Sequence, residues 1–316
     1  MKKTCVGLSL SLLSVSVFAV ENGTTVDWQN DFDDMVKSRC TGLVVGGNQI
    51  LTALHCSDLT DITFVNGDVV TASARADHPD YVWGGSGSSY DVSVWTLPQA
   101  AKTQNIHYFA DLNVQNVSIG DEAQAYGFGG DYPLSYATLL IDKLTAHLTE
   151  YQGNAVTGNN IGGDSGGVWM KDGLIVAINQ AIGALTTYGT DLHYAKDFLL
   201  EEINGWHYPT VLKGTGTQTI KVQSLHQNAV VDAAYVAGDV AITGGTCQTL
   251  LTINAFDTCT YELDVTGSGQ LHLTTNEVID INPVTQSTSS SGGSSGGSLG
   301  FLSLLGLALF GRLRQK

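Results

Sequence analysis

Positive charge is scarce in this chain of 316 residues. Lysine and arginine together number 14 against 30 aspartates and glutamates, which gives a formal net charge of −16 at pH 7. Binding to nucleic acid needs a basic face that neutralises phosphates. The composition therefore excludes nucleic acid as an expected partner, and we attribute the acidity to solubility.

The sequence also lacks the motifs that hold common cofactors. It contains no phosphate-binding loop, no GxGxxG fingerprint and no cysteine–histidine cluster at the spacing of a metal site. We therefore expect no cofactor and no metal ion.

Glycine is abundant instead, with 37 residues, and short runs of Val, Ile, Thr and Leu lie between the glycines. This pattern predicts an all-β chain, with one helix over residues 194–203. The length suggests about two domains. Residues 211–283 alternate apolar and polar positions, as at Ile220 and Val222, which predicts a small β-sandwich accessory domain with a binding or spacer role.

Residues 1–19 have the features of an export signal. Lys2 and Lys3 precede a mostly apolar run, and Val17-Phe18-Ala19 fits a cleavage site. Cleavage by signal peptidase after Ala19 makes Val20 the first residue of the exported protein.

Removal of the signal takes one of the five cysteines with it. An even number of cysteines in an exported chain predicts disulfides. Three pairings of the remaining four are possible, and their nearness in sequence favours Cys40–Cys56 and Cys247–Cys259.

The C-terminal end is a second targeting signal. Residues 284–298 form a Ser/Gly-rich linker, and residues 299–316 form an apolar helix with a basic end. At ~1.5 Å per residue the apolar run reaches ~20 Å, short of a hydrocarbon core of ~30 Å. The layout, with Ser291-Gly292-Gly293 at its start, resembles the GlyGly-CTERM sorting tail of Gram-negative bacteria; a plain C-terminal anchor is the alternative. The resemblance implies removal of the helix by a rhombosortase-like protease, type II secretion, and a secreted or surface location.

The stretch with the strongest chemical signal is Gly162 to Gly167. Its Ser165 lies between glycines on a tight turn where few side chains block approach. The amides of Gly163 and Ser165 are placed to point together at one oxygen, as an oxyanion hole does.

A histidine and an aspartate precede this serine. His55 follows the apolar run Gln49–Thr52 and adjoins Cys56, so that a Cys40–Cys56 disulfide would fix its position. Asp91 begins an alternating strand, where a buried carboxylate can reach an imidazole. Asp80 is a weaker rival for the same role.

Three motifs, Thr52-Ala53-Leu54-His55-Cys56, Asp91-Val92-Ser93-Val94 and Gly163-Asp164-Ser165-Gly166-Gly167, resemble the chymotrypsin/trypsin-like serine protease family in kind and in order. The resemblance covers residues 20–208 and implies two six-stranded β-barrels with the active site between them. It implies that Ser165 is the nucleophile, His55 the general base and Asp91 its orienting carboxylate, acting on a protein or peptide substrate.

In this family a new N-terminus folds inward and its ammonium pairs with the aspartate before the nucleophile. Since Val20 directly follows the signal cleavage site, we expect signal peptidase itself to create the ammonium that pairs with Asp164.

The chain departs from the family at the specificity pocket. Asn159 stands at the base of the pocket, where an aspartate selects Lys and Arg, and a neutral amide cannot compensate a buried ammonium. Asp191, in a segment assigned to another pocket wall, is the candidate for supplying the charge. The usual Ser-Trp-Gly strand reads Asn179-Gln180-Ala181.

These departures leave alternatives to a secreted serine endopeptidase. One is a pseudo-protease or surface-binding protein that keeps the fold without turnover, and another is a hydrolase of esters.

Overall fold

A computed structural model describes residues 20–57, 61–84, 87–144 and 149–283. The predicted signal (1–19), linker (284–298) and tail (299–316) lie outside the described residues, so their assignment stays a prediction. Among the described residues no helix is long and apolar enough to cross a membrane.

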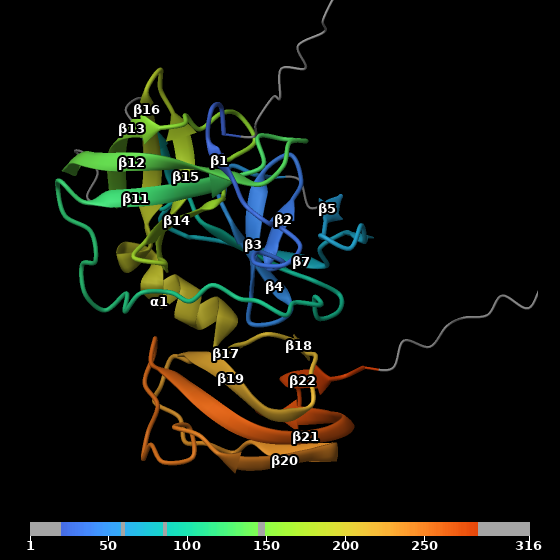
Figure 1. Cartoon of the computed structure of the whole chain (residues 1–316). Coiled ribbons are helices and arrows are strands. Elements are labelled where there is room, and N and C mark those ends of the chain that lie inside the picture. The colour runs from blue at the N-terminus through green and yellow to red at the C-terminus, as the bar shows by residue number, and fades with distance from the viewer. Residues whose placement is uncertain (1–19, 58–60, 85–86, 145–148, 284–316) are drawn as a thin grey trace, which may run out of the picture. The chain divides into compact units, whose positions relative to one another are not determined.

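The first half of the chain forms a seven-stranded antiparallel sheet in the order β6-β5-β2-β3-β4-β10-β7 (Figure 1). Its buried face gathers large apolar side chains such as Leu43, Leu51 and Trp95. The strands are β2 (Met35–Lys37), β3 (Thr41–Val45), β4 (Gln49–Thr52), β5 (Ile62–Thr63), β6 (Val69–Val70), β7 (Ala74–Asp77) and β10 (Ser93–Thr96), with a separate hairpin of β8 (Val82–Gly84) and β9 (Gly87–Ser89).

The second sheet closes on itself. Its order is β1-β12-β11-β14-β15-β16-β13, and β12 also pairs with β13, which makes a six-stranded barrel with β1 added outside. Trp169 and Tyr151 are fully buried in its core. The strands are β1 (Thr24–Thr25), β11 (Glu122–Gly127), β12 (Ser135–Leu144), β13 (Glu150–Thr157), β14 (Val168–Lys171), β15 (Leu174–Ile182) and β16 (Thr186–Asp191).

The predicted all-β, two-barrel fold is confirmed. The second barrel is closed, and the described pairings leave the first as an open half-barrel.

The helix α1 (Leu192–Ile203) follows β16. It confirms the helix expected over 194–203 but begins earlier, because Asp191 caps it and accepts a hydrogen bond from the His193 amide (3.0 Å). It ends at Asn204, which has a left-handed backbone (φ 37°).

A third sheet follows α1, in the order β17-β19-β21-β22-β18, with β20 paired to β21. Fifteen buried residues, among them Tyr261 and Leu263, form its own apolar core. The strands are β17 (Gly205–His207), β18 (Val211–Leu212), β19 (Gly216–Leu225), β20 (Tyr235–Gly244), β21 (Thr258–His272) and β22 (Val278–Ile281). Strand β17 pairs with β19 and Trp206 belongs to this core, so the third sheet begins at Gly205. The domain division expected at 208–211 stays a prediction.

The third sheet is hydrogen-bonded to the long connection between β10 and β11. The fully buried side chain of Gln223 accepts from the Phe109 amide (2.9 Å) and donates to the carbonyls of Phe109 (2.8 Å) and Phe256 (3.0 Å). His207 Nε2 lies 2.9 Å from the His107 carbonyl. The predicted accessory domain is therefore bonded to the protease segment rather than a free spacer.

We expect the substitution Gln223→Ala to lower the free energy of unfolding by about 2 to 4 kcal/mol, because it leaves an amide and two carbonyls buried without partners. Urea denaturation measures the change. The control is Gln227→Ala, at an exposed position, which should stay within about 0.5 kcal/mol. Equal stabilities of the two variants would contradict this interpretation of the Gln223 side chain.

Candidate active site

Strand register brings His55 and Asp91 together. Strands β4 and β10 are antiparallel neighbours, with Thr52 opposite Ser93. At the same end of this pair, the chain runs forward from Thr52 to His55 and backward from Ser93 to Asp91. The two residues are distant in sequence but adjacent in space because both lie just beyond the ends of paired strands.

Asp91 holds His55 by two hydrogen bonds. Its Oδ1 accepts from the His55 backbone amide (2.9 Å), and its Oδ2 lies 2.7 Å from the imidazole Nδ1. Asp91 is fully buried, whereas 28 % of the His55 side chain is exposed. The rival Asp80 is exposed and its amide donates to His78 Nδ1 (3.2 Å), so the carboxylate beside His55 is Asp91.

The backbone just before Asp91 is in an uncommon conformation. Tyr90 has φ 54°, in the left-handed region that non-glycine residues rarely adopt. Its ring stacks on His78 at 4.3 Å between centroids, and the His78 amide donates to the Val92 carbonyl (3.1 Å). These contacts hold the turn that carries Asp91 toward His55.

Ser165 lies in the turn that leads into β14. Its carbonyl accepts from the Thr41 amide (2.8 Å) at the start of β3, and Thr41 Oγ1 donates to the Gly163 carbonyl (3.0 Å). The loop that contains Ser165 is thus attached to the half-barrel that carries His55.

Two glycines make this turn possible. Gly163 has φ 103°, and a Cβ there would lie 2.2 Å from the Gly130 amide nitrogen. Gly166 has φ 80°, and a Cβ would lie 2.1 Å from Thr52 Oγ1. Among the described residues, the amides of Gly163 and Ser165 donate to no protein acceptor, so both remain able to bind a substrate oxygen.

The disulfide Cys40–Cys56 connects the start of β3 to the histidine segment, and the predicted Cys247–Cys259 is also formed, which confirms both pairings. Cys56 Sγ lies 3.9 Å from the Ser165 carbonyl oxygen. Within the described part of the chain no hydrogen bond joins the Ser165 hydroxyl to His55. Such catalytic bonds are often long before substrate binds.

Cys40, His55 and Cys56 are also the one group of potential metal ligands that lies close together among the described residues, with ligand atoms within 4.8 Å of one another. The two sulfurs are bonded to each other and therefore are not the thiolates that zinc requires.

Asp164 is buried beside Ser165. Its carboxylate accepts from the amides of Gly129 and Ile161 (both 2.7 Å) and from the Asn160 side chain (3.3 Å), and no ion pair to it is found in the described part of the chain. Burial raises its pKa to about 6, against the lowering effect of these hydrogen bonds. A cation beside the Asp164 carboxylate would stabilise its charged form and lower its pKa.

The segment that begins at Val20 is paired with the chain at Asn159, five residues before Asp164. Val20 is fully buried, and Glu21 and Asn159 exchange two backbone hydrogen bonds of 2.9 Å. The structure thus pairs the start of the expected mature chain with the segment that leads to Asp164. It records no contact between Val20 and the Asp164 carboxylate.

The two expected pocket residues are not together. The Asn159 side chain donates to the Ala184 carbonyl (3.4 Å), and its Oδ1 is buried without a partner. Asp191 lies at the far end of β16, where it caps α1 and accepts from Gln115 Nε2 (2.8 Å). The Asp191 carboxylate is therefore engaged at the start of α1, and its role in the pocket stays a prediction.

Sequence reasoning did not find the residues that support the loop. Thr41 carries no motif, and Asn179 was noted only as a departure from the family strand. Asn179 accepts from the Trp169 indole and donates to the carbonyls of Tyr126 (2.8 Å) and Asp164 (3.1 Å). The signal available for Asn179 was a polar residue within an apolar strand, at a position that the structure shows to be buried.

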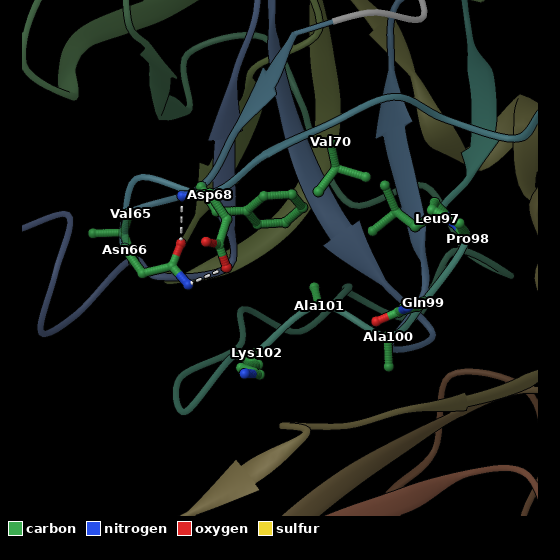
Figure 2. Close-up of a pocket in the computed structure, with 11 residues that line it drawn as sticks. Val65, Asn66, Asp68, Val70, Leu97, Pro98, Gln99, Ala100, Ala101 and Lys102 are labelled. Carbon is green, nitrogen blue, oxygen red and sulfur yellow. Dashed lines mark hydrogen bonds between the residues drawn. The ribbon is translucent and has the colours of Figure 1, made fainter. Parts of the chain in front are cut away.

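A cavity of about 300 Å³ lies elsewhere, between the β5–β6 hairpin and residues 97–102 (Figure 2). Its lining includes Phe64, Val70 and Leu97, while Asn66 and Asp68 bond each other at its edge. None of the residues His55, Asp91 and Ser165 lines it, so it is separate from the candidate active site.

Solved structures similar to this chain include proteases and their relatives. One is the VesB protease of Vibrio cholerae, with 16% identity, covering 79% of this chain and 93% of that chain, and a TM-score of 0.48. Others are the human heparin binding protein (14% identity, 56% and 93% coverage, TM-score 0.48) and an inactivated protease paralogue of the scabies mite (14%, 58% and 99%, 0.48). No curated protein matches the chain.

The family comparison rests on sequence. The trypsin family model matches residues 19–191, more than half of the 316-residue chain. The matched segment contains the histidine, aspartate and serine described above, and both barrels. The chain therefore belongs to the trypsin family of serine endopeptidases.

Proposed function

We propose that the chain hydrolyses peptide bonds through a triad of Ser165, His55 and Asp91. The observation that carries this proposal is the pair of hydrogen bonds by which the buried Asp91 carboxylate holds His55. Because Asp91 accepts from Nδ1, the neutral ring presents the lone pair of Nε2 toward solvent, where a base is needed.

The chemistry follows from these positions. His55 Nε2 takes the proton of Ser165 Oγ as that oxygen attacks the substrate carbonyl. The amides of Gly163 and Ser165 bind the resulting oxyanion. His55 then gives its proton to the leaving amine, and a water molecule, activated by the same base, hydrolyses the acyl-enzyme to the free acid and restores Ser165.

A fluorophosphonate probe tests the triad. We expect covalent labelling of Ser165 in the mature protein, with labelling abolished in Ser165→Ala and retained in the control Ser118→Ala, which changes an exposed serine.

Failure to label Ser165 would favour the alternative, a protein that keeps the fold without turnover.

We propose further that Asn159 makes the pocket base neutral, so that cleavage does not select Lys or Arg. Support comes from the buried Asn159 Oδ1 and from the use of Asp191 at the helix start. We expect Asn159→Asp to raise kcat/KM for Lys and Arg peptides at least about tenfold relative to Ala or Leu peptides, since the new carboxylate compensates the buried cation. A peptide-library cleavage profile measures this, with Asn154→Asp on the neighbouring strand as control. An unchanged preference would remove Asn159 from the pocket.

We propose that export by signal peptidase also activates the enzyme, through the Val20 ammonium and Asp164. Val20 burial and the Glu21–Asn159 pairing support this, as does the uncompensated Asp164 carboxylate. The predicted removal of the tail by a rhombosortase-like protease, type II secretion and the surface location belong to the same proposal.

The pH dependence of stability should differ between the chain kept uncleaved before Val20 and the chain that starts at Val20, because only the second has an ammonium that can pair with Asp164. In a chain kept uncleaved before Val20, the pKa of Asp164 in the folded protein is about 6, above the ordinary value of 3.8. The stability that this group contributes is therefore fully present below pH 3.8 and is lost as the pH rises through about 6. In the form that starts at Val20, the ammonium should lower the pKa of Asp164, and this loss should disappear.

Urea denaturation at pH 4 and pH 7 measures the difference, and N-terminal sequencing with intact mass identifies both ends of the active enzyme. An active enzyme that starts downstream of Val20 would overturn the proposal.

A further inference from the structure

Asn179 occupies a central position under the nucleophile loop. It lies on β15 and only 3 % of it is exposed. Its Oδ1 accepts from the Trp169 indole, and its Nδ2 donates to the carbonyls of Tyr126 (2.8 Å) and Asp164 (3.1 Å). All the hydrogen-bonding groups of the amide are therefore used.

The backbone of Asn179 contacts the other side of the same loop. Its amide donates to the Gly167 carbonyl (2.7 Å), and its carbonyl accepts from the Gly166 amide (2.8 Å). One residue thus binds the peptide units on both sides of Ser165: Asp164 before it, and Gly166 and Gly167 after it.

The pairing of β15 with β16 is irregular at this point, with a register shift between Asn179 and Ala181. The strand therefore does not continue regular pairing beside the loop, and side-chain hydrogen bonds supply part of what holds it there.

We infer that Asn179 is a positioning residue for catalysis: its side-chain amide fixes the Asp164–Gly167 backbone so that Ser165 and the two oxyanion amides have their reactive orientation. The inference rests on the proposed function and deepens it. Asn179 acts through the loop and touches no reacting atom.

A purely structural role would give a different result, and the chain offers a matched control. Gln223 is also a fully buried amide that accepts one hydrogen bond and donates two to backbone carbonyls, but it does so between the third sheet and the connection between the barrels. Asn179→Asp and Gln223→Glu each replace the NH2 donors by an oxygen that faces two carbonyls.

We expect Asn179→Asp to lower kcat for a small ester or peptide substrate about 100-fold, with KM changed less than threefold, because orientation in the transition state is lost rather than binding. The fluorophosphonate labelling rate should fall in parallel. Gln223→Glu should be less stable but keep kcat within twofold, when activity is expressed per folded molecule.

Two further readouts separate positioning from stability. The kcat ratio of Asn179→Asp to the unsubstituted protein should rise as pH falls, because the protonated carboxyl regains one donor. In NMR spectra the amide signals of Gly166 and Gly167 should shift in Asn179→Asp and stay unchanged in Gln223→Glu.

A normal kcat in folded Asn179→Asp, or an equal loss of kcat in Gln223→Glu, would overturn the inference. If the unsubstituted protein is not labelled at Ser165, the proposed function fails. The amide signals then still decide whether Asn179 holds the loop, and unshifted Gly166 and Gly167 signals would refute it.

Discussion

The structure depends first on the alignment of two antiparallel strands. With Thr52 opposite Ser93, β4 and β10 end beside each other and release His55 and Asp91 at the same edge. A slip of one residue would turn the following side chains to the opposite face. The full burial of the Asp91 carboxylate is tolerated because the His55 amide and ring satisfy it.

The turn that contains Ser165 leads into β14 of the second barrel and is positioned by a different means. The loop around Ser165 has little regular secondary structure, and side chains and backbone groups of three residues hold it by hydrogen bonds. Thr41 binds it from the half-barrel and Asn179 binds it from β15. The Asp164 carboxylate accepts hydrogen bonds from the amides of Gly129 and Ile161. The glycines at 163 and 166 allow the chain to approach Gly130 and Thr52 closely, which a Cβ would prevent.

Much of this was predictable from sequence because the informative residues carry strong local signals. The glycine-flanked Ser165 and the Cys56 beside His55 are recognisable in one dimension, and nearness in sequence gave both disulfides correctly. The helix cap formed by Asp191 was not predicted, because an aspartate before a helix and an aspartate in a pocket look alike in sequence. The role of Asn179 could not be foreseen, since its partners Tyr126 and Asp164 lie on other elements. Strand β17 was not predicted because it is only three residues long.

The hydrogen bonds of the connection between β10 and β11 also bear on autolysis, the cleavage of one enzyme molecule by another. A peptide must leave its surroundings and extend before a protease can cut it, and long irregular connections are the usual sites of nicking. Here Asp33 and Asp34 accept hydrogen bonds from the amides of Gln104, Asn105 and His107, and Gln223 binds both polar groups of the Phe109 backbone. Self-digestion at this connection would first have to break these bonds, which come from Asp33 and Asp34 before β2 and from Gln223 of the third sheet.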